Sequence, residues 1–228
     1  MKKLLSILLF AFCSLSIFAA DKPLRILVMG DDPAAAMYGP LLSEYFNELV
    51  TVDVLPANQM QSSDATTLLN AANKGDVVLL CKRENPAEAK ELSIEEAYLA
   101  SMESIQKAAN KRGIKLIWLT PVSPRYFTAE GVQIHRYGVY PDVMRRMVKR
   151  DQLPFIDLEQ LTFDWLTELG LQASEMYYEP TPVIAPEYHE KAARTGSELT
   201  QDGAKIVAEK LMEGLKALKL NYLKKYFK

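Results

Sequence analysis

Histidine and cysteine are scarce in this chain, which has two of each among its 228 residues. Cys13 lies in an apolar N-terminal run, so Cys81 alone remains once that run is removed, and no internal disulfide can form. Because Cys81 stands inside an apolar segment, we expect a small buried side chain rather than a reactive thiol. The two histidines, His135 and His189, belong to no cluster with metal-ligand spacing, so we expect neither a metal nor a cofactor.

A second long hydrophobic run is also missing. The one such run, Leu4–Phe18, follows Lys2 and Lys3 and precedes the small pair Ala19-Ala20. This pattern predicts a signal peptide over 1–20, with an uncleaved N-terminal anchor as the alternative. We therefore expect a periplasmic or secreted protein, free of the membrane after cleavage, with a single domain over 21–228.

An excess of positive charge is absent as well. The formal net charge is −2, and removal of the two N-terminal lysines brings it to −4. A mildly acidic chain is a poor partner for nucleic acid, so we expect none. The composition indicates no particular oligomeric state.

What the sequence does contain is an alternation of strand and helix patterns. The strand-like runs are short and rich in Val, Ile and Leu, as in strands that are buried on both faces. They are Arg25–Met29, Thr51–Leu55, Asp76–Cys81, Lys115–Thr120 and Pro154–Asp157. Helices are predicted over Ala34–Leu49, Asp64–Ala72, Ser93–Arg112, Asp142–Arg150 and Thr200–Lys219, and the basic segment Tyr222–Lys228 is expected to be a solvated helix end. This order predicts a three-layer α/β/α sandwich around a five-stranded parallel sheet, with a site at the carboxyl ends of the strands.

The end of the first strand places a carboxylate at a sharp turn. Arg25–Met29 runs into Gly30-Asp31-Asp32, and a helix is expected to begin immediately afterwards. Such a turn exposes one side chain beside the N–H groups of the helix, and hydrolases place a nucleophilic serine there. This chain has Asp32 instead.

At these loops the chain resembles the SGNH/GDSL hydrolases, in particular the rhamnogalacturonan acetylesterase-like branch of secreted esterases that deacetylate pectin. The resemblance rests on Gly30-Asp31-Asp32-Pro33, Thr120-Pro121-Val122-Ser123-Pro124-Arg125 and Gly138-Val139-Tyr140-Pro141-Asp142-Val143-Met144-Arg145-Arg146. It covers nearly the whole chain after the signal peptide. It implies the same α/β/α fold and a catalytic Ser-His-Asp triad.

The resemblance also shows where the triad has changed. Asp32 holds the serine position, and Thr195 and Glu198 hold the aspartate and histidine positions before the last helix. Asn85 matches the oxyanion asparagine. A carboxylate beside the developing oxyanion opposes its stabilisation, so we expect an impaired or inactive esterase.

Four further residues are predicted to contact a ligand, which the resemblance identifies as a saccharide or an acetylated glycan. They are Gln59, Arg83, Arg125 and His189. Guanidinium groups match the carboxylates of acidic sugars, and structural ion pairs are the alternative for both arginines. His189 is also a candidate replacement base, whereas His135 is expected to be a surface or locally hydrogen-bonded residue.

Three functions follow from these residues. The first is a catalytically degenerate relative of carbohydrate acetylesterases that retains a saccharide-binding cleft. The second is an active hydrolase in which Asp32, Glu198 and Asn85 take altered roles, with Asp32 and Glu198 facing one another as an acid–base or cation-binding pair. The third is a periplasmic interaction protein with a vestigial cleft.

Overall fold

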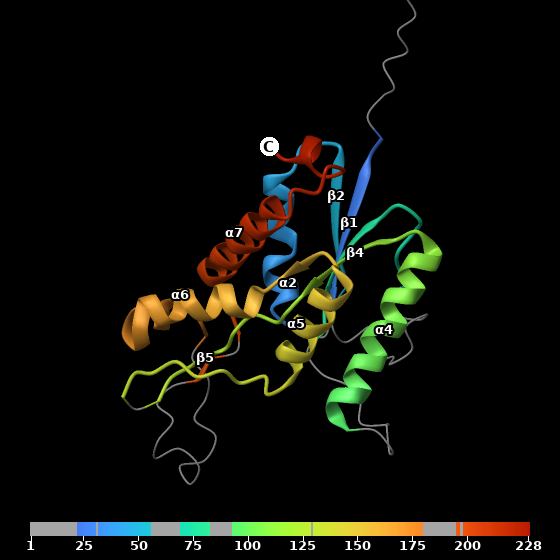
Figure 1. The fold of residues 1–228 in the computed structure, drawn as a ribbon. Coiled ribbons are helices and arrows are strands. Elements are labelled where there is room, and N and C mark those ends of the chain that lie inside the picture. Colours follow the sequence, from blue (N-terminus) through green and yellow to red (C-terminus); the bar gives the residue numbers. More distant parts are fainter. Residues whose placement is uncertain are drawn as a thin grey trace, which may run out of the picture.

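The computed structural model describes residues 22–30, 32–55, 69–82, 93–128, 130–179, 195–196 and 198–228 (Figure 1). The predicted signal peptide, 1–20, lies outside these residues. Among the described residues, none of the helices combines the length and the apolar character that a bilayer span requires.

A five-stranded parallel sheet forms the centre of the fold. Its strands are β1 (Leu24–Gly30), β2 (Val50–Leu55), β3 (Val77–Cys81), β4 (Lys115–Leu119) and β6 (Phe155–Ile156). They lie in the order β2-β1-β3-β4-β6, and each neighbouring pair is parallel. The five predicted strands are confirmed.

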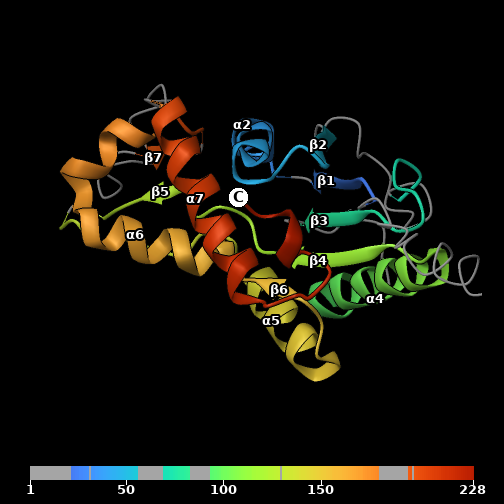
Figure 2. The same cartoon turned by 90° about the horizontal axis from the view of Figure 1, so that it is seen from above.

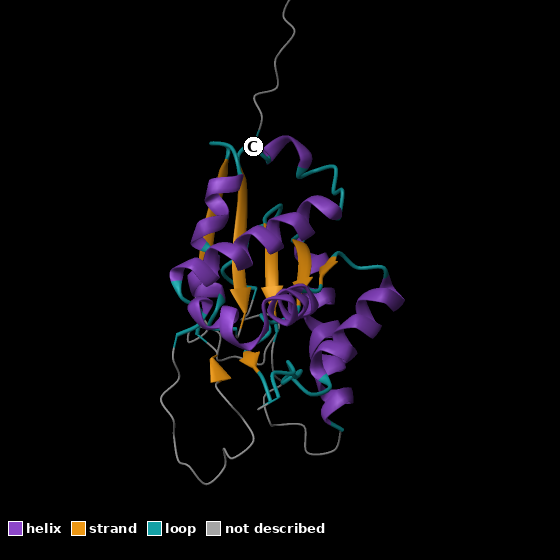
Figure 3. Cartoon of the chain, turned by 90° about the vertical axis from the view of Figure 1, so that its left-hand side faces the viewer, coloured by secondary structure: helices purple, strands orange, loops and turns teal. Residues whose placement is uncertain are grey.

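Helices cover both faces of this sheet (Figures 2 and 3). Alternate residues of β1 point to opposite sides, so that Ile26 and Val28 pack in one core and Leu27 and Met29 pack in the other. The first core is completed by α2 (Ala35–Tyr38), α6 (Leu158–Ala173) and α7 (Gln201–Ala217), and the second by α4 (Ile94–Arg112) and α5 (Tyr140–Asp151). The predicted three-layer sandwich is therefore confirmed, and Cys81 is buried as expected.

The helix termini confirm the signals in the sequence. Ser93 and Glu96 form a capping box at the start of α4, where the predicted helix begins, and Gly113 ends that helix in the left-handed conformation. Pro141 stands in the first turn of α5, and the Thr200 side chain accepts from the N–H of Gly203 at the start of α7.

The helix predicted over Ala34–Leu49 is wrong in its length. α2 ends at Tyr38, and the 3-10 helix η1 (Pro40–Tyr45) follows. Pro40 has no N–H for an intrahelical bond, and the backbone at Gly39 passes so close to the sheet that an added Cβ would lie 2.7 Å from the Val54 side chain. The apolar pattern continues through this break because both short helices face the same core.

The predicted helix over Asp64–Ala72 lies mostly outside the described residues, which resume at Leu69 in a turn. The C-terminal segment differs from the expected solvated helix end. Tyr226 is 6% exposed, and Phe227 stacks on Phe46 with ring centroids 5.3 Å apart. The end of the chain therefore packs on the core rather than in solvent.

Two short strands extend the carboxyl edge of the sheet. β5 (Arg125–Tyr126) follows β4, and β7 (Thr195–Gly196) pairs with it in antiparallel fashion (Figure 2). This pair brings the segment before the last helix next to the loop that follows β4.

Candidate functional site

The turn after β1 depends on a close approach between two strands. A Cβ on Gly30 would lie 2.0 Å from the carbonyl oxygen of Cys81 on β3, so only glycine fits there. The chain leaves the sheet at this point, and Asp32 follows at the carboxyl edge, directly before α2. Asp32 therefore lies at the predicted turn, but its side chain is buried there rather than exposed.

The Asp32 carboxylate is turned into the protein. The residue is 4% exposed. Its Oδ1 accepts from the backbone N–H of Ala34 at 3.0 Å, and its Oδ2 accepts from the backbone N–H of Val122 at 2.9 Å. The Cys81 thiol lies 3.9 Å from the same Oδ2. Asp32 thus fastens the turn after β1 to the ends of β3 and β4.

This environment affects two neighbouring tyrosines. Burial raises the pKa of Tyr38 well above its ordinary value, and the negative charge of Asp32 adds to the shift. Burial also raises the pKa of Tyr178, Asp32 adds to it, and the positive charge of Arg125 opposes it. The Tyr178 hydroxyl donates to the carbonyl of Ser123 at 2.8 Å, whereas the buried Tyr38 hydroxyl has no partner among the described residues.

A carboxylate in this setting is poorly suited to nucleophilic attack. Both of its oxygens accept backbone hydrogen bonds, which stabilise the negative charge that would have to be donated to a substrate. A buried carboxylate is also shielded from the water that a second, hydrolytic step needs. We interpret Asp32 as a structural link between three strand ends.

Glu198 and Thr195 are the residues predicted at the other two triad positions. Glu198 is exposed, and its carbonyl accepts from the N–H of Glu179 at 2.9 Å. Thr195 pairs with Tyr126 through the β5–β7 ladder. The contrast between a buried Asp32 and an exposed Glu198 does not favour the predicted acid–base or cation-binding pair.

Arg125 is also directed inward. The residue is 3% exposed, its Nε donates to the Ser174 hydroxyl at 2.9 Å, and its Nη2 donates to the carbonyl of Leu171 at 2.6 Å. These bonds tie β5 to the end of α6. The structural alternative therefore describes Arg125 better than the predicted ligand contact, although these two partners are neutral rather than acidic.

The remaining predicted site residues lie outside the described residues. They are Gln59, Arg83, Asn85 and His189. Their roles in ligand binding and oxyanion stabilisation stay predictions.

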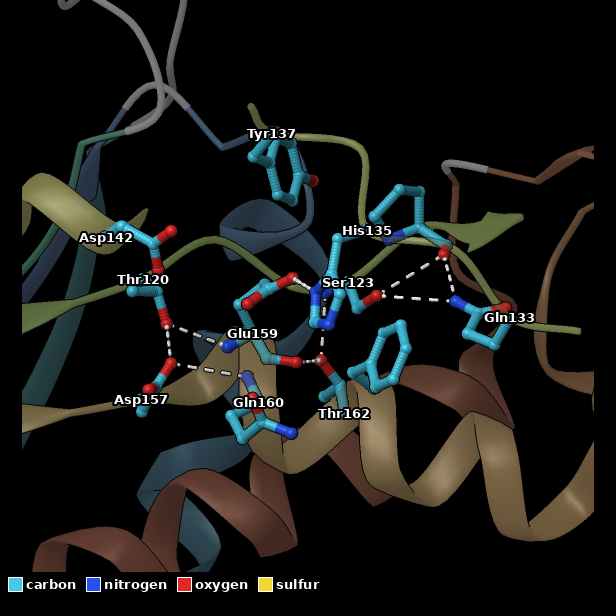
Figure 4. A network of polar contacts seen from close by, with 12 residues as sticks. Thr120, Ser123, Gln133, His135, Tyr137, Asp142, Asp157, Glu159, Gln160 and Thr162 are labelled. Carbon is cyan, nitrogen blue, oxygen red and sulfur yellow. Dashed lines mark hydrogen bonds and ion pairs between the residues drawn. The ribbon is translucent and has the colours of Figure 1, made fainter. Parts of the chain in front are cut away.

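A polar network that the sequence did not reveal lies beside this region, where β4 and β6 end (Figure 4). Asp157 follows β6, and its carboxylate accepts from the Thr120 hydroxyl at 3.0 Å and from Nε and Nη2 of Arg145 at 2.7 and 2.9 Å. The hydrogen bonds that Arg145 donates to Asp157 and Glu159 raise the pKa of its guanidinium and outweigh the opposing effect of burial. Arg145 is therefore held in its charged form.

Glu159 and His135 form the outer part of the network. Glu159 is 1% exposed, and its two carboxylate oxygens lie 2.6 Å from Arg145 Nη2 and 2.5 Å from His135 Nδ1. The His135 side chain is 52% exposed and stacks on Phe163, with ring centroids 3.8 Å apart and planes 5° apart. The expectation of a locally hydrogen-bonded His135 is confirmed, but its partner was not foreseen.

The sequence carried partial signals for this network. Asp157 closes a predicted strand, at the carboxyl edge of the sheet, and Arg145 lies in the motif that begins at Gly138. Glu159 and His135 had no such signal. Among the described residues no three His, Cys, Asp or Glu side chains are grouped so that they could hold a metal ion.

The comparisons with known proteins agree with this geometry. No family model matches the chain. Rhamnogalacturonan acetylesterase RhgT of Bacillus subtilis (strain 168) is 22% identical over 219 residues, which cover 87% of this chain and 92% of that protein. The structure of YXIM from Bacillus subtilis superposes with a TM-score of 0.62 at 18% identity, over 87% of this chain and 58% of that one. The acetyl xylan esterase AlAXEase gives a TM-score of 0.54 at 14% identity, over 84% of this chain and 100% of that one.

The fold is therefore that of the SGNH/GDSL hydrolases. Within that class the chain resembles carbohydrate esterases, with a rhamnogalacturonan acetylesterase among its relatives.

Proposed function

We propose that this chain is a periplasmic or secreted carbohydrate-esterase relative that binds a saccharide without serine-esterase chemistry. The observation that carries the proposal is the burial of Asp32, whose two carboxylate oxygens are held by the N–H groups of Ala34 and Val122. A group in this state has neither the alcohol oxygen nor the freedom that acyl transfer needs. The presence of Thr195 and Glu198 at the positions that the resemblance assigns to aspartate and histidine supports the same conclusion.

Saccharide binding is proposed because the relatives act on acetylated polysaccharides and because polar and aromatic groups lie at the carboxyl edge of the sheet. Tyr126 stands in β5, and His135 and Arg136 follow in the loop between β5 and α5; the Arg136 guanidinium lies 4.2 Å from the Tyr126 ring centroid. Aromatic faces with hydrogen-bonding groups beside them are suited to sugar rings, which present C–H faces and hydroxyl edges.

The test separates binding from turnover. Purified protein is titrated with rhamnogalacturonan oligosaccharides in a calorimeter and is also incubated with p-nitrophenyl acetate and with acetylated oligosaccharides. We expect binding and no ester cleavage that depends on Asp32. Asp32→Asn is the matched variant, because its amide oxygen can still accept one of the two N–H groups.

Two outcomes contradict the proposal in different ways. Ester cleavage by the wild-type protein that a folded Asp32→Asn variant lacks would establish an active hydrolase with altered roles. Absence of saccharide binding together with a co-purifying protein partner would establish the interaction protein instead.

A further inference from the structure

His135 is a surface residue whose ring is held in one orientation. Its Nδ1 lies 2.5 Å from Glu159 Oε1, and one of its faces is covered by the Phe163 ring. The side chain nevertheless remains 52% exposed. A fixed ring has already lost the rotamer freedom that binding would otherwise cost, so it is prepared for a ligand.

The partner of His135 determines which nitrogen remains available. Glu159 is buried, and its second oxygen is hydrogen-bonded to Arg145. A carboxylate accepts hydrogen bonds, so Nδ1 is the donor in the contact with Glu159. Nε2 has no hydrogen-bond partner among the described residues.

The charges around the ring indicate the class of ligand. Three carboxylates lie in the network, those of Glu159, Asp157 and Asp142, against the single guanidinium of Arg145. The neighbouring guanidinium of Arg136 lies over the Tyr126 ring. The excess of negative charge in the network disfavours a uronate carboxylate at this position and leaves an uncharged hydroxyl as the suitable partner.

We propose that His135, held by Glu159 and Phe163, is a binding subsite for a neutral sugar unit, with Nε2 hydrogen-bonded to a ring hydroxyl and the uncovered imidazole face packing on the C–H face of the sugar. The proposal rests on the saccharide binding proposed above. It differs from that proposal in naming the residue and the uncharged unit that it contacts. It assigns His135 to binding, with no role in bond cleavage.

The variants separate ligand contact from support of the loop. His135→Asn retains an amide N–H near the position of Nδ1 and can still donate to Glu159, but it has neither Nε2 nor the ring. Val132→Ala is the matched control, because Val132 is 59% exposed in the same loop and lies outside the network. Affinity for neutral xylo-oligosaccharides and for rhamnogalacturonan oligosaccharides is measured by calorimetry, and thermal unfolding is measured for each variant.

We expect His135→Asn to lose roughly tenfold in affinity while its unfolding temperature stays near that of the wild type, and Val132→Ala to change neither. Because the chain has two histidines, ¹⁵N imidazole spectra show two ring systems, and the one absent from His135→Asn identifies His135. Its Nε2 signal should shift on titration of the wild-type protein.

Each alternative outcome is recognisable. Wild-type protein that binds oligosaccharide with an unchanged Nε2 signal and an unchanged affinity in His135→Asn would overturn the subsite and leave the proposed function standing. An affinity loss that follows the loss of thermal stability would assign His135 to loop support and would also overturn the subsite. Wild-type protein that binds no oligosaccharide would overturn both.

Discussion

Asp32 and His135 lie at the same carboxyl edge of one sheet, but their polar atoms are used in opposite ways. The Asp32 carboxylate is buried and bound by two backbone N–H groups of the protein itself. At His135 the buried group is the partner, Glu159, and the titratable ring is the part that reaches solvent. The residue at the position that the resemblance assigns to a catalytic serine is therefore buried, and the accessible polar group belongs to the neighbouring network at the ends of β4 and β6.

The comparison teaches that location at the end of a parallel strand does not by itself define a reactive group. What decides is how the hydrogen-bonding capacity of that group is satisfied. Both carboxylate oxygens of Asp32 accept hydrogen bonds from the backbone. One ring nitrogen of His135 is hydrogen-bonded to Glu159, and the other has no partner among the described residues.

The largest expected effect comes from breaking the scaffold behind His135. Arg145→Ala leaves the buried Glu159 and the half-buried Asp157 without their cation, and we expect a loss of about 3 to 4 kcal/mol in the free energy of unfolding. Urea unfolding measures this loss. Arg150→Ala is the matched control in the same helix, because Arg150 pairs with Glu103 and Asp151 at exposed positions.

We expect Arg150→Ala to change stability little, since exposed ion pairs contribute weakly. Equal losses of stability in the two variants would show that the charges of the network at the ends of β4 and β6 contribute no more to stability than exposed ion pairs do.

A smaller effect on stability is expected at the turn after β1, where Asp32 lies. Asp32→Ala leaves the N–H groups of Ala34 and Val122 without their acceptor in a buried position, and we expect a loss of about 2 to 3 kcal/mol in the free energy of unfolding. Asp32→Asn retains one acceptor and should lose about half as much. Chemical denaturation of both variants measures the difference, and an Asp32→Ala variant as stable as the wild type would show that Asp32 is not the structural link that its hydrogen bonds indicate.

The fold was largely predictable because it is recorded in local patterns. Strands buried on both faces read as continuous runs of Val, Ile and Leu, and the capping box at Ser93 and the glycine at Gly113 marked both ends of α4. The helix over Ala34–Leu49 failed because an amphipathic pattern continues across a break in the backbone. Gly39-Pro40 was the visible signal of that break.

The site was predictable in position and not in environment. The resemblance placed Asp32 at the turn after β1. The hydrogen bond from the Val122 N–H to Asp32, however, joins residues that only the assembled sheet brings together. The same holds for His135 and Glu159, whose contact depends on the loop between β5 and α5 folding onto the start of α6. Sequence spacing carries no information about such pairs unless a known motif contains them.

The smallest expected effect concerns two tyrosines near Asp32, and it tests how far the turn after β1 is shielded from solvent. Burial raises the pKa of Tyr38 and of Tyr178 in the folded protein, so the stability linked to each is fully present below the unfolded value of about 10 and is lost as the pH rises above it. Each tyrosine then lowers the free energy of unfolding by up to about 1.4 kcal/mol per pH unit.

Tyr38→Phe should remove its share of this decline without cost at pH 7, because the Tyr38 hydroxyl is buried with no partner among the described residues. Tyr178→Phe should cost about 1 kcal/mol at pH 7, because it removes the hydrogen bond to the Ser123 carbonyl. Urea unfolding at neutral and alkaline pH measures both effects. An equal loss of stability in the two variants at pH 7 would show that the Tyr38 hydroxyl is hydrogen-bonded. The turn after β1 would then be more open than the burial of Asp32 indicates.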